Sequence, residues 1–327
     1  NMLEIINRCN DPFFNLALEE YLLNREDIKK DIFLLWQNRP VVVVGRNQNT
    51  IEEINQSFIQ EKGIEVVRRI SGGGAVYHDL GNLNFTFIVN DSPSLTLNFT
   101  RFTAPVIKAL QTIGVKAEDQ GRNDISIRGR KFSGNAQCRQ KGRLMHHGTI
   151  LFDTNLEDME QALTVDYAKI SSKGVKSVMS RVTNIAEHIS SSVTIEEFQD
   201  ILSNTIDRDR ECRELSTFEL SVVESLRDNK FRRWEWVYGF SPSFNIRKSQ
   251  RFDWGSIDFR INVKKGLIID CKIYGDFFAT GDIGIIEQQL IGVRYRNEDM
   301  LQALESMNLA SYFPEAYLND IIELIRK

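Results

Sequence analysis

Cysteine is scarce in this chain, with four residues among 327, at positions 9, 138, 212 and 271. They lie far apart and form no CxxC pair, so the sequence indicates neither a zinc site nor a disulfide framework. We therefore expect all four thiols to be reduced.

Long apolar runs and an excess of basic charge are also lacking. No stretch reaches the roughly 18 uncharged apolar residues of a membrane helix, and the start NMLEIINRCNDPF lacks the basic and apolar regions of a secretory signal. The formal net charge of −4 argues against a general nucleic-acid binder, which needs a strongly basic face. We expect a cytoplasmic protein that binds neither a membrane nor a nucleic acid.

The apolar content is sufficient for a sizeable core. Hydrophobic residues make up 42% of the chain and charged residues 26%, which at this length favours more than one domain. An aromatic-rich stretch turns polar near residue 246. We place a boundary there and divide the chain into domains 1–246 and 247–327.

Helical signals occur at both ends of the chain and in its middle. Asp11 followed by Pro12 predicts a helix start, and Thr194 with Glu197 forms a capping box before an apolar pattern. Further helices are expected at 50–63, closed by Gly63, and at 297–308 and 314–326.

Short β-rich runs lie between these helices. DIFLLW and VVVVGR, residues 31–36 and 41–46, predict two strands joined as a hairpin. Other strands are expected at 64–70, at 84–89, at 124–134 with a turn over Arg128 and Gly129, and within 253–276. A mixed sheet covered by helices follows from this order.

Three consecutive glycines, Gly72 to Gly74, stand in RISGGGAVYHDLGN, residues 69–82. Glycine permits positive φ angles or the close approach of a ligand, and several free N–H groups can then face one anion. The stretch fits neither the P-loop pattern nor the dinucleotide-binding pattern. Because two arginines precede the glycines and polar side chains follow them, we interpret the stretch as a binding site rather than a plain turn between strands.

A second group of candidate residues lies in GRNDISIRGRKFSGNAQC and HHGTILF, residues 121–138 and 146–152. Lys131 lies just beyond a tight turn, where a solvated lysine is the alternative to a functional one. His146 and His147 are neighbours on an expected strand, so they point to opposite faces and cannot easily bind one metal. An ordinary imidazole at the edge of the core is the alternative for His147.

Four segments together resemble the lipoate–protein ligase A family, within the wider biotin and lipoate ligase fold. They are RRISGGGAVYHDLGN, GRNDISIRGRKFSGNA, HHGTILF and KGVKSVMSRVTNI. Their order and separation are more specific than a single glycine loop, and the similarity covers roughly residues 1–246. Residues 247–327 resemble the small C-terminal accessory domain of the bacterial enzymes.

The resemblance implies an α+β fold of mixed, largely antiparallel sheets packed with helices, plus a small α+β C-terminal domain. It also implies a two-step reaction, in which lipoate and MgATP form lipoyl-AMP and pyrophosphate before the lipoyl group passes to a lysine. The implied acceptors are apo lipoyl domains of 2-oxo acid dehydrogenase acyltransferase subunits, the glycine-cleavage H protein, or both.

The resemblance further assigns roles to single residues. Lys131 is the implied catalytic residue, since its ammonium would offset the repulsion between the lipoate carboxylate and the α-phosphate. His78 and Asp79 would orient the glycine loop through hydrogen bonds. The implied ATP ligands are Arg69, Gly74, Ala75, Val76, Tyr77, Asn123, Asp124 and Lys131, with Asp124 also holding Mg²⁺. The implied lipoate ligands are Arg68, Ser71, Gly72, Gly73, Lys131, Ser133, Ala136, His147 and Thr149.

Some expectations remain open beside the ligase. Ile70 stands where relatives can carry a serine, so one hydroxyl contact to the acyl group is expected to be missing. Residues 173–178 are expected to form a mobile loop over the adenylate, and residues 166–176 and 181–184 to match the helical part of the family's large domain. The alternatives are a transferase that uses Cys138 and no ATP, a non-catalytic lipoate-binding protein, and a biotin ligase.

Overall fold

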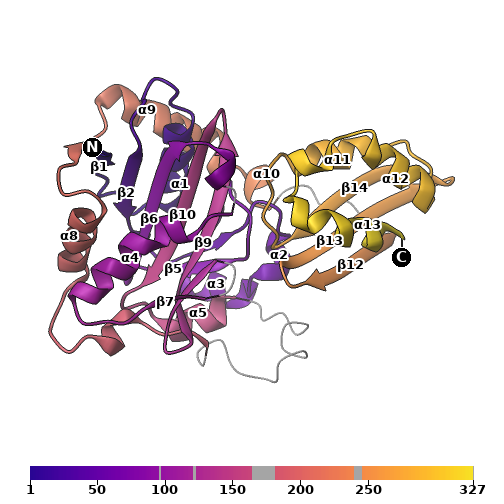
Figure 1. The fold of residues 1–327 in the computed structure, drawn as a ribbon. Coiled ribbons are helices and arrows are strands. Elements are labelled where there is room, and N and C mark those ends of the chain that lie inside the picture. The colour runs from indigo at the N-terminus through magenta and orange to yellow at the C-terminus, as the bar shows by residue number, and fades with distance from the viewer. Residues whose placement is uncertain (96, 121–122, 164–180, 239–244, 327) are drawn as a thin grey trace.

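The computed structural model describes residues 1–95, 97–120, 123–163, 181–238 and 245–326 (Figure 1). These residues form an α+β fold with a mixed, largely antiparallel main sheet, as predicted. The segments 166–176 and 173–178, for which a helix and a mobile loop were predicted, lie outside the described residues. In the part of the chain that is described, no helix is both long and apolar enough to cross a bilayer.

The main sheet has eight strands within the described residues. β1 pairs in parallel with β11 and with β2, and the other neighbours pair antiparallel. In order across the sheet the strands are β11 (Glu211–Arg213), β1 (Leu3–Ile5), β2 (Ile32–Trp36), β6 (Asn82–Asn90), β10 (Arg143–Leu151), β9 (Arg130–Gln140), β8 (Asp124–Ile127) and β7 (Glu118–Gln120).

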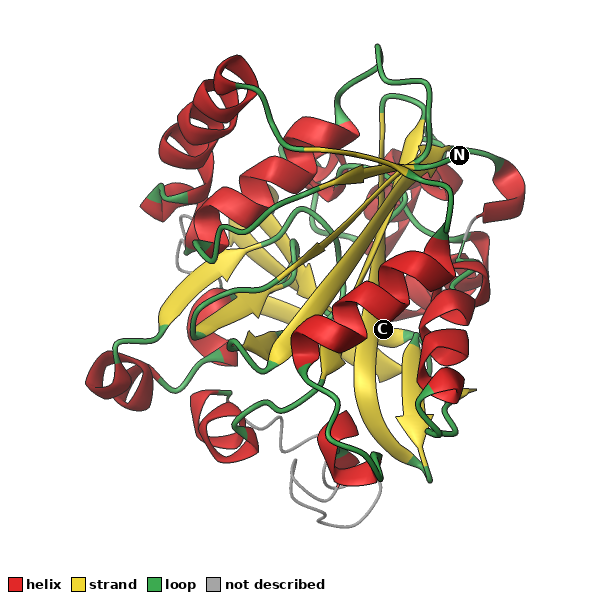
Figure 2. Ribbon diagram, turned by 90° about the vertical axis from the view of Figure 1, so that its left-hand side faces the viewer, coloured by secondary structure: helices red, strands yellow, loops and turns green. Residues whose placement is uncertain are grey.

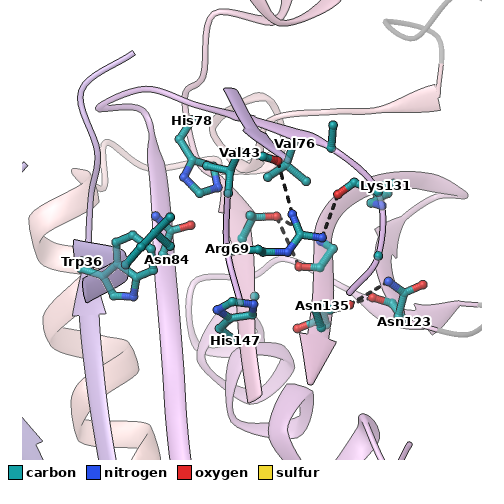
Figure 3. A pocket seen from close by; sticks show the side chains of 18 residues that line it. Trp36, Val43, Arg69, Val76, His78, Asn84, Asn123, Lys131, Asn135 and His147 are labelled. Carbon is teal, nitrogen blue, oxygen red and sulfur yellow. Dashed lines mark hydrogen bonds between the residues drawn. The ribbon is translucent and has the colours of Figure 1, made fainter. Parts of the chain in front are cut away.

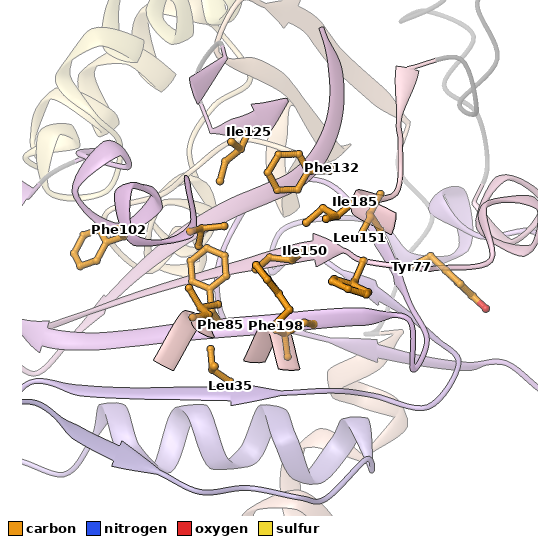
Figure 4. Close-up of a cluster of buried hydrophobic side chains, with 14 of the residues drawn as sticks. Leu35, Tyr77, Phe85, Phe102, Ile125, Phe132, Ile150, Leu151, Ile185 and Phe198 are labelled. Atoms are coloured by element: carbon orange, nitrogen blue, oxygen red, sulfur yellow. The ribbon is translucent and has the colours of Figure 1, made fainter. Parts of the chain in front are cut away.

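Helices pack on both faces of the main sheet, so that in Figure 2 the strands run through the middle of the molecule. Successive strand residues point to opposite faces, and β2 therefore sends Ile32 and Leu34 to one face but Phe33 and Leu35 to the other. The first pair joins α1 (Pro12–Leu23) in one hydrophobic cluster. The second pair joins α4 (Thr100–Thr112) and α8 (Ile195–Ile206) in another, in which Phe85, Phe102 and Phe198 lie (Figure 4).

A second sheet has the strand order β4 (Glu65–Arg68), β3 (Val41–Val44) and β5 (Val76–His78). The predicted hairpin between residues 31–36 and 41–46 is therefore wrong, because β2 lies in the main sheet and β3 in this one. The connection is no exposed turn. Its residue Asn38 is fully buried and hydrogen-bonded to Asn15 and His78, so the chain turns a buried corner between the two sheets.

The helix predicted at 50–63 is divided into α2 (Thr50–Glu53) and α3 (Gln56–Lys62). Ile54 is extended and bridges to Leu163, and the Asn55 side chain accepts from the Phe58 amide to start α3. Gly63 closes α3 with a φ of 65°, as predicted. The remaining helices of this part are η1 (Pro93–Leu95), α5 (Leu156–Ala162), η2 (Ile185–His188), α9 (Thr217–Leu226), the π-helix η3 (Arg227–Phe231) and α10 (Trp234–Val237).

Three other local predictions are confirmed. Asp11 caps α1 by accepting from the Phe13 amide at 3.0 Å. The capping box of Thr194 and Glu197 starts α8. Arg128 and Gly129, with φ angles of 51° and 76°, form the turn between β8 and β9.

Residues 246–326, here called the C-terminal unit, have an antiparallel sheet and a hydrophobic core of their own. The two predicted closing helices are confirmed, whereas α11 was not predicted. The boundary near 246 stays a prediction. The elements are β12 (Ile246–Phe252), β13 (Gly255–Lys264), β14 (Leu267–Gly275), α11 (Ile283–Leu290), α12 (Asn297–Glu305), η4 (Leu309–Ser311), η5 (Glu315–Tyr317) and α13 (Leu318–Arg326).

The C-terminal unit contacts the glycine stretch through main-chain atoms. The Gly73 amide donates to the Phe277 carbonyl oxygen at 3.1 Å, and the Gly275 amide donates to the Asn47 carbonyl oxygen at 2.8 Å. A Cβ atom on Gly72 would lie 2.4 Å from the Phe277 carbonyl oxygen. Backbone therefore meets backbone here, and Gly72 leaves room for the contact.

Gly72→Ala is expected to push the C-terminal unit away, because a backbone carbonyl cannot yield as a side chain can. We expect a larger radius of gyration in solution scattering and a loss of about 1–3 kcal/mol of stability from overpacking. Gly74→Ala is the matched control, since its Cβ would meet nothing nearer than Asp276 Cβ at 4.0 Å. Equal radii of gyration for the two variants would contradict this account.

Candidate functional site

A cavity lies between the two sheets, on the face of the main sheet that also carries α1. The space between its walls amounts to about 600 Å³, a volume that includes solvent at its mouth. Its lining residues are Leu16, Trp36, Val43, Arg69, Gly73, Gly74, Ala75, Val76, His78, Asn84, Asn123, Lys131, Gly134, Asn135, Ala136, His147, Gly148 and Thr149.

The two ends of the cavity differ in chemistry. Figure 3 shows Trp36, His78 and Asn84 on one side of Arg69, and Lys131 with Asn123 on the other. We call these the Trp36 end and the Lys131 end. Leucine, valine and alanine side chains supply much of the remaining wall, so a ligand with an apolar chain and a charged head fits the cavity.

Arg69 holds the glycine turn in shape. Its Nη2 donates to the carbonyl oxygens of Gly72 and Gly74 at 2.6 and 2.8 Å, and its Nη1 donates to that of Val43 at 3.3 Å. Nε donates to Ser71 Oγ at 3.0 Å. Burial lowers the pKa of Arg69 to about 10, so the guanidinium still carries its charge at neutral pH.

A buried chain of hydrogen bonds ties the Trp36 end to this arginine. Trp36 Nε1 donates to Thr86 Oγ1 at 2.9 Å, and that hydroxyl donates to Glu19 Oε1 at 2.6 Å. His147 Nδ1 donates to the same carboxylate at 2.9 Å, and His147 Nε2 lies 2.6 Å from Ser71 Oγ. With the Nδ1 proton facing the carboxylate, Nε2 of a neutral His147 is an acceptor, and the Ser71 hydroxyl can donate to it while it accepts from Arg69.

Lys131 owes its direction to an irregularity in the sheet. The pairing of β8 with β9 shifts register between Ile125 and Ser126, opposite Ser133 and Lys131. Such a bulge re-aims a side chain. Lys131 Nζ lies 2.7 Å from Asp124 Oδ1, and the lysine side chain is 40% exposed, so its ammonium remains within reach of a ligand.

Two glycines that line the cavity leave no room for a side chain. A Cβ on Gly134 would lie 3.1 Å from Lys131 Nζ, and one on Gly148 would lie 2.3 Å from Asn135 Oδ1. Asn123 is held in place because its Nδ2 donates to the Asn135 carbonyl oxygen at 2.8 Å. A larger residue at Gly134 would therefore crowd the Lys131 side chain, and one at Gly148 would collide with Asn135 and the Phe85 ring.

The structure brings most of the expected site residues to one cavity. The expected residues that line it are Arg69, Gly73, Gly74, Ala75, Val76, Asn123, Lys131, Ala136, His147 and Thr149. Ser71 supports His147, and Asp124 pairs with Lys131, from just outside the lining. His146 points to the opposite face from His147, as predicted, and stacks on Phe102 with ring centroids 4.6 Å apart.

Four expected residues lie away from the lining. Arg68 faces the other side of its strand, where it donates to the carbonyl oxygens of Gly45, Arg46, Gln48, Trp236 and Val237. Tyr77 also alternates away, into the core around α3 and α5 (Figure 4). Gly72 faces Phe277, and buried Ser133 accepts from Asn135.

Three functional candidates were not found from the sequence, namely Glu19, Trp36 and Asn84. Glu19 stands in the apolar helix sequence FFNLALEEYLL and is only 1% exposed. A glutamate among the apolar residues of a helix can be noticed in the sequence. Its role could not be predicted, because its partners Thr86 and His147 are distant in sequence. Trp36 and Asn84 gave no comparable signal.

The cavity offers one carboxylate near its charged end rather than a dedicated metal cage. No group of three or more histidine, cysteine, aspartate or glutamate side chains with metal-binding geometry occurs in the described residues. Cys138 does not line the cavity but a neighbouring cleft with Glu20 and Ser71. Burial raises the pKa of the Cys138 thiol to about 12, so it is protonated at neutral pH.

Two family models match the chain. Residues 11–207 match the lipoyl protein ligase A/B catalytic domain, and residues 241–325 match the bacterial lipoate protein ligase C-terminus. Together they span most of the sequence.

Individual relatives agree with these models. The lipoate-protein ligase LplJ of Bacillus subtilis is 46% identical over 99% of this chain and all of its own length. The crystal structure of P. falciparum LipL1 in complex with lipoate is 27% identical, with a TM-score of 0.82 over 99% of both chains. A crystal structure of lipoate-protein ligase A bound with ATP is 25% identical, with a TM-score of 0.64 over 73% of this chain and 98% of that one. The chain belongs to the lipoate–protein ligase family and is an enzyme of the acid–amine ligase type.

Proposed function

We propose that the cavity binds lipoate and ATP, forms lipoyl-AMP, and transfers the lipoyl group to a lysine of an apo lipoyl domain or of a glycine-cleavage H protein. The observation that carries this proposal is the cavity itself, which joins an apolar interior to the Lys131 ammonium beside a glycine turn. The related structures that hold lipoate or ATP support both ligands. A cytoplasmic location is part of the proposal.

In the first step a lipoate carboxylate oxygen attacks the α-phosphorus of ATP. The bond from that phosphorus to the bridging oxygen breaks, and pyrophosphate leaves. Two anions must approach each other, which is why a cation between them lowers the barrier. Lys131, whose side chain is 40% exposed, supplies this charge in our proposal, and we place the lipoate chain along the cavity toward Trp36.

The glycine turn provides donors for the nucleotide. Arg69 is occupied with the carbonyl oxygens of the turn, so its role in binding ATP is to fix the turn and to add positive charge behind it. Gly74, Ala75 and Val76 line the cavity, and we assign their main-chain N–H groups to the phosphates. We assign Arg68 and Tyr77 to the support of this framework instead of ligand contact.

Asp124 fits a Mg²⁺ ion that is bound mainly through phosphates. Mg²⁺ in such sites takes one or two carboxylates plus phosphate and water oxygens, and Asp124 beside Lys131 is one such carboxylate. When bound, the ion would neutralise negative charge on the phosphates. His147 and Thr149 remain as neighbours of the acyl group.

In the second step the acceptor lysine, as a free amine, attacks the carbonyl carbon of lipoyl-AMP. The bond to the phosphate oxygen breaks, AMP leaves with that oxygen, and the nitrogen loses a proton. Because the Lys131 side chain is 40% exposed whereas Trp36, His78 and Asn84 are buried, we expect the amine to reach the carbonyl from the Lys131 end. The decisive experiment is incubation with lipoate, MgATP and an apo lipoyl domain, followed by mass measurement of that domain; an unmodified domain would refute the proposal.

Lys131→Ala is expected to lose most lipoate-dependent ATP–pyrophosphate exchange. Two charges about 4 Å apart interact by roughly 4 kcal/mol at an effective dielectric near 20. Partial exposure and the pairing with Asp124 reduce this, so we expect a loss on the order of 100- to 1,000-fold. Lys141→Ala, on an exposed hairpin, is the control with unchanged exchange. A folded Lys131 variant with normal exchange would remove this residue from the mechanism.

Cys138→Ala is expected to keep lipoyl transfer within about threefold of the wild-type rate, because a thiol with a pKa near 12 is not a thiolate at neutral pH. Transfer should require ATP and show no inflection from a cysteine between pH 7 and 9. Transfer without ATP that disappears in the variant would establish the transferase alternative instead. Lipoate binding without ATP–pyrophosphate exchange would establish the other alternative, a non-catalytic lipoate-binding protein.

A further inference from the structure

The Trp36 end of the cavity carries two buried polar atoms that have no hydrogen-bond partner among the described residues. They are Nε2 of His78 and the amide nitrogen of Asn84. The two residues are 3% and 2% exposed, both line the cavity, and Figure 3 shows them beside Trp36. An unpaired buried donor destabilises a protein, so its presence at a ligand cavity indicates a partner that arrives with the ligand.

A chain of side-chain amides fixes which nitrogen of His78 carries the proton. Asn15 Nδ2 donates to the carbonyl oxygens of Cys9 and Gln37 at 2.9 and 3.0 Å, which identifies it as the nitrogen. It also donates to Asn38 Oδ1 at 2.8 Å, so Asn38 Nδ2 faces His78 Nδ1 at 3.0 Å. Nδ1 is therefore the acceptor, and Nε2 carries the hydrogen.

The surroundings of this N–H suit a neutral acceptor. Burial, together with the charge of Arg69, lowers the pKa of His78 to about 3, so the ring is uncharged at neutral pH. Leu16 and Val43 add apolar wall to the same cavity. The Trp36 ring meets the His78 ring edge to face, with centroids 6.2 Å apart.

We propose that the His78 N–H, with the Asn84 amide beside it, recognises a ring sulfur of the dithiolane at the far end of lipoate, and so makes the enzyme prefer lipoate to octanoate. This inference rests on the proposed function, because it places the carboxylate at Lys131. Sulfur is a weak hydrogen-bond acceptor that also packs favourably against aromatic rings.

Octanoate has the same chain length but carries only hydrogen at the positions of the sulfurs. Its terminal methyl group would cover the two donors without pairing with them. A site that hydrogen-bonds one substrate discriminates against the analogue that lacks the acceptor, because its polar groups are then left unpaired. Since sulfur accepts weakly, the expected discrimination is about 10-fold rather than the far larger factors found for hydroxyl groups.

Titration calorimetry on the full chain, with each acid and without ATP, tests this inference. We expect the wild-type protein to bind lipoate about 10-fold more tightly than octanoate. His78→Phe should weaken the binding of lipoate and so reduce this ratio of affinities below about threefold. Phenylalanine keeps a ring against Trp36 and removes the N–H. His188→Phe, outside the cavity lining, is the matched control and should keep the wild-type ratio.

Because His78→Phe also leaves Asn38 without an acceptor, a second measurement uses the wild-type protein alone. The Nε2 proton resonance of His78 should move on addition of lipoate but not of octanoate. Equal affinities for the two acids, an unchanged ratio in a folded His78 variant, or an unmoved resonance at saturating lipoate would each overturn the inference and leave the proposed function intact. Failure to bind either acid would overturn both.

Discussion

The structure depends on one buried interaction, the hydrogen bonds from the Arg69 guanidinium to the carbonyl oxygens of the glycine turn. This charge is taken out of water, which is costly unless each of its donors finds an acceptor. Here the carbonyl oxygens of Val43, Gly72 and Gly74 and the hydroxyl of Ser71 serve that purpose. Ser71 passes the constraint on to His147, and so to helix α1 through Glu19. The cavity is thus shaped by a polar network that spans both sheets, and apolar packing fills in around it.

The alternation of side chains along each strand divides the residues between chemistry and framework. Val76 and His78 face the cavity, whereas Tyr77 between them enters the core. Arg69 faces the glycine turn, while Arg68 ties its strand to the backbone around residues 45–50 and to α10. Neighbouring residues of the same chemical type therefore have different functions, because successive residues of a strand point to opposite faces.

Much of the fold and part of the site follow from the sequence, for physical reasons that individual residues illustrate. Caps and tight turns are local, so Asp11, the box at Thr194 and the Arg128–Gly129 turn were predictable. The hairpin at residues 31–46 was not, because strand pairing is decided by distant partners and the connection is buried at Asn38. The glycine stretch and Lys131 stood out by composition, whereas Glu19 acquires its meaning only beside Thr86 and His147. The role of Arg68 could not be predicted either. It depends on which of the two adjacent arginines points toward the cavity, and the sequence does not show this.

The main-chain bond between the Gly73 amide and the Phe277 carbonyl oxygen has a thermodynamic consequence. One N–H cannot serve two acceptors at full strength, so the Gly73 amide is not available to a ligand while this bond is in place. Any ligand that required this amide would compete with the docking of residues 246–326, and by linkage the docking would weaken the binding of such a ligand by the same factor. The C-terminal unit thus restricts which main-chain donors of the turn face the cavity.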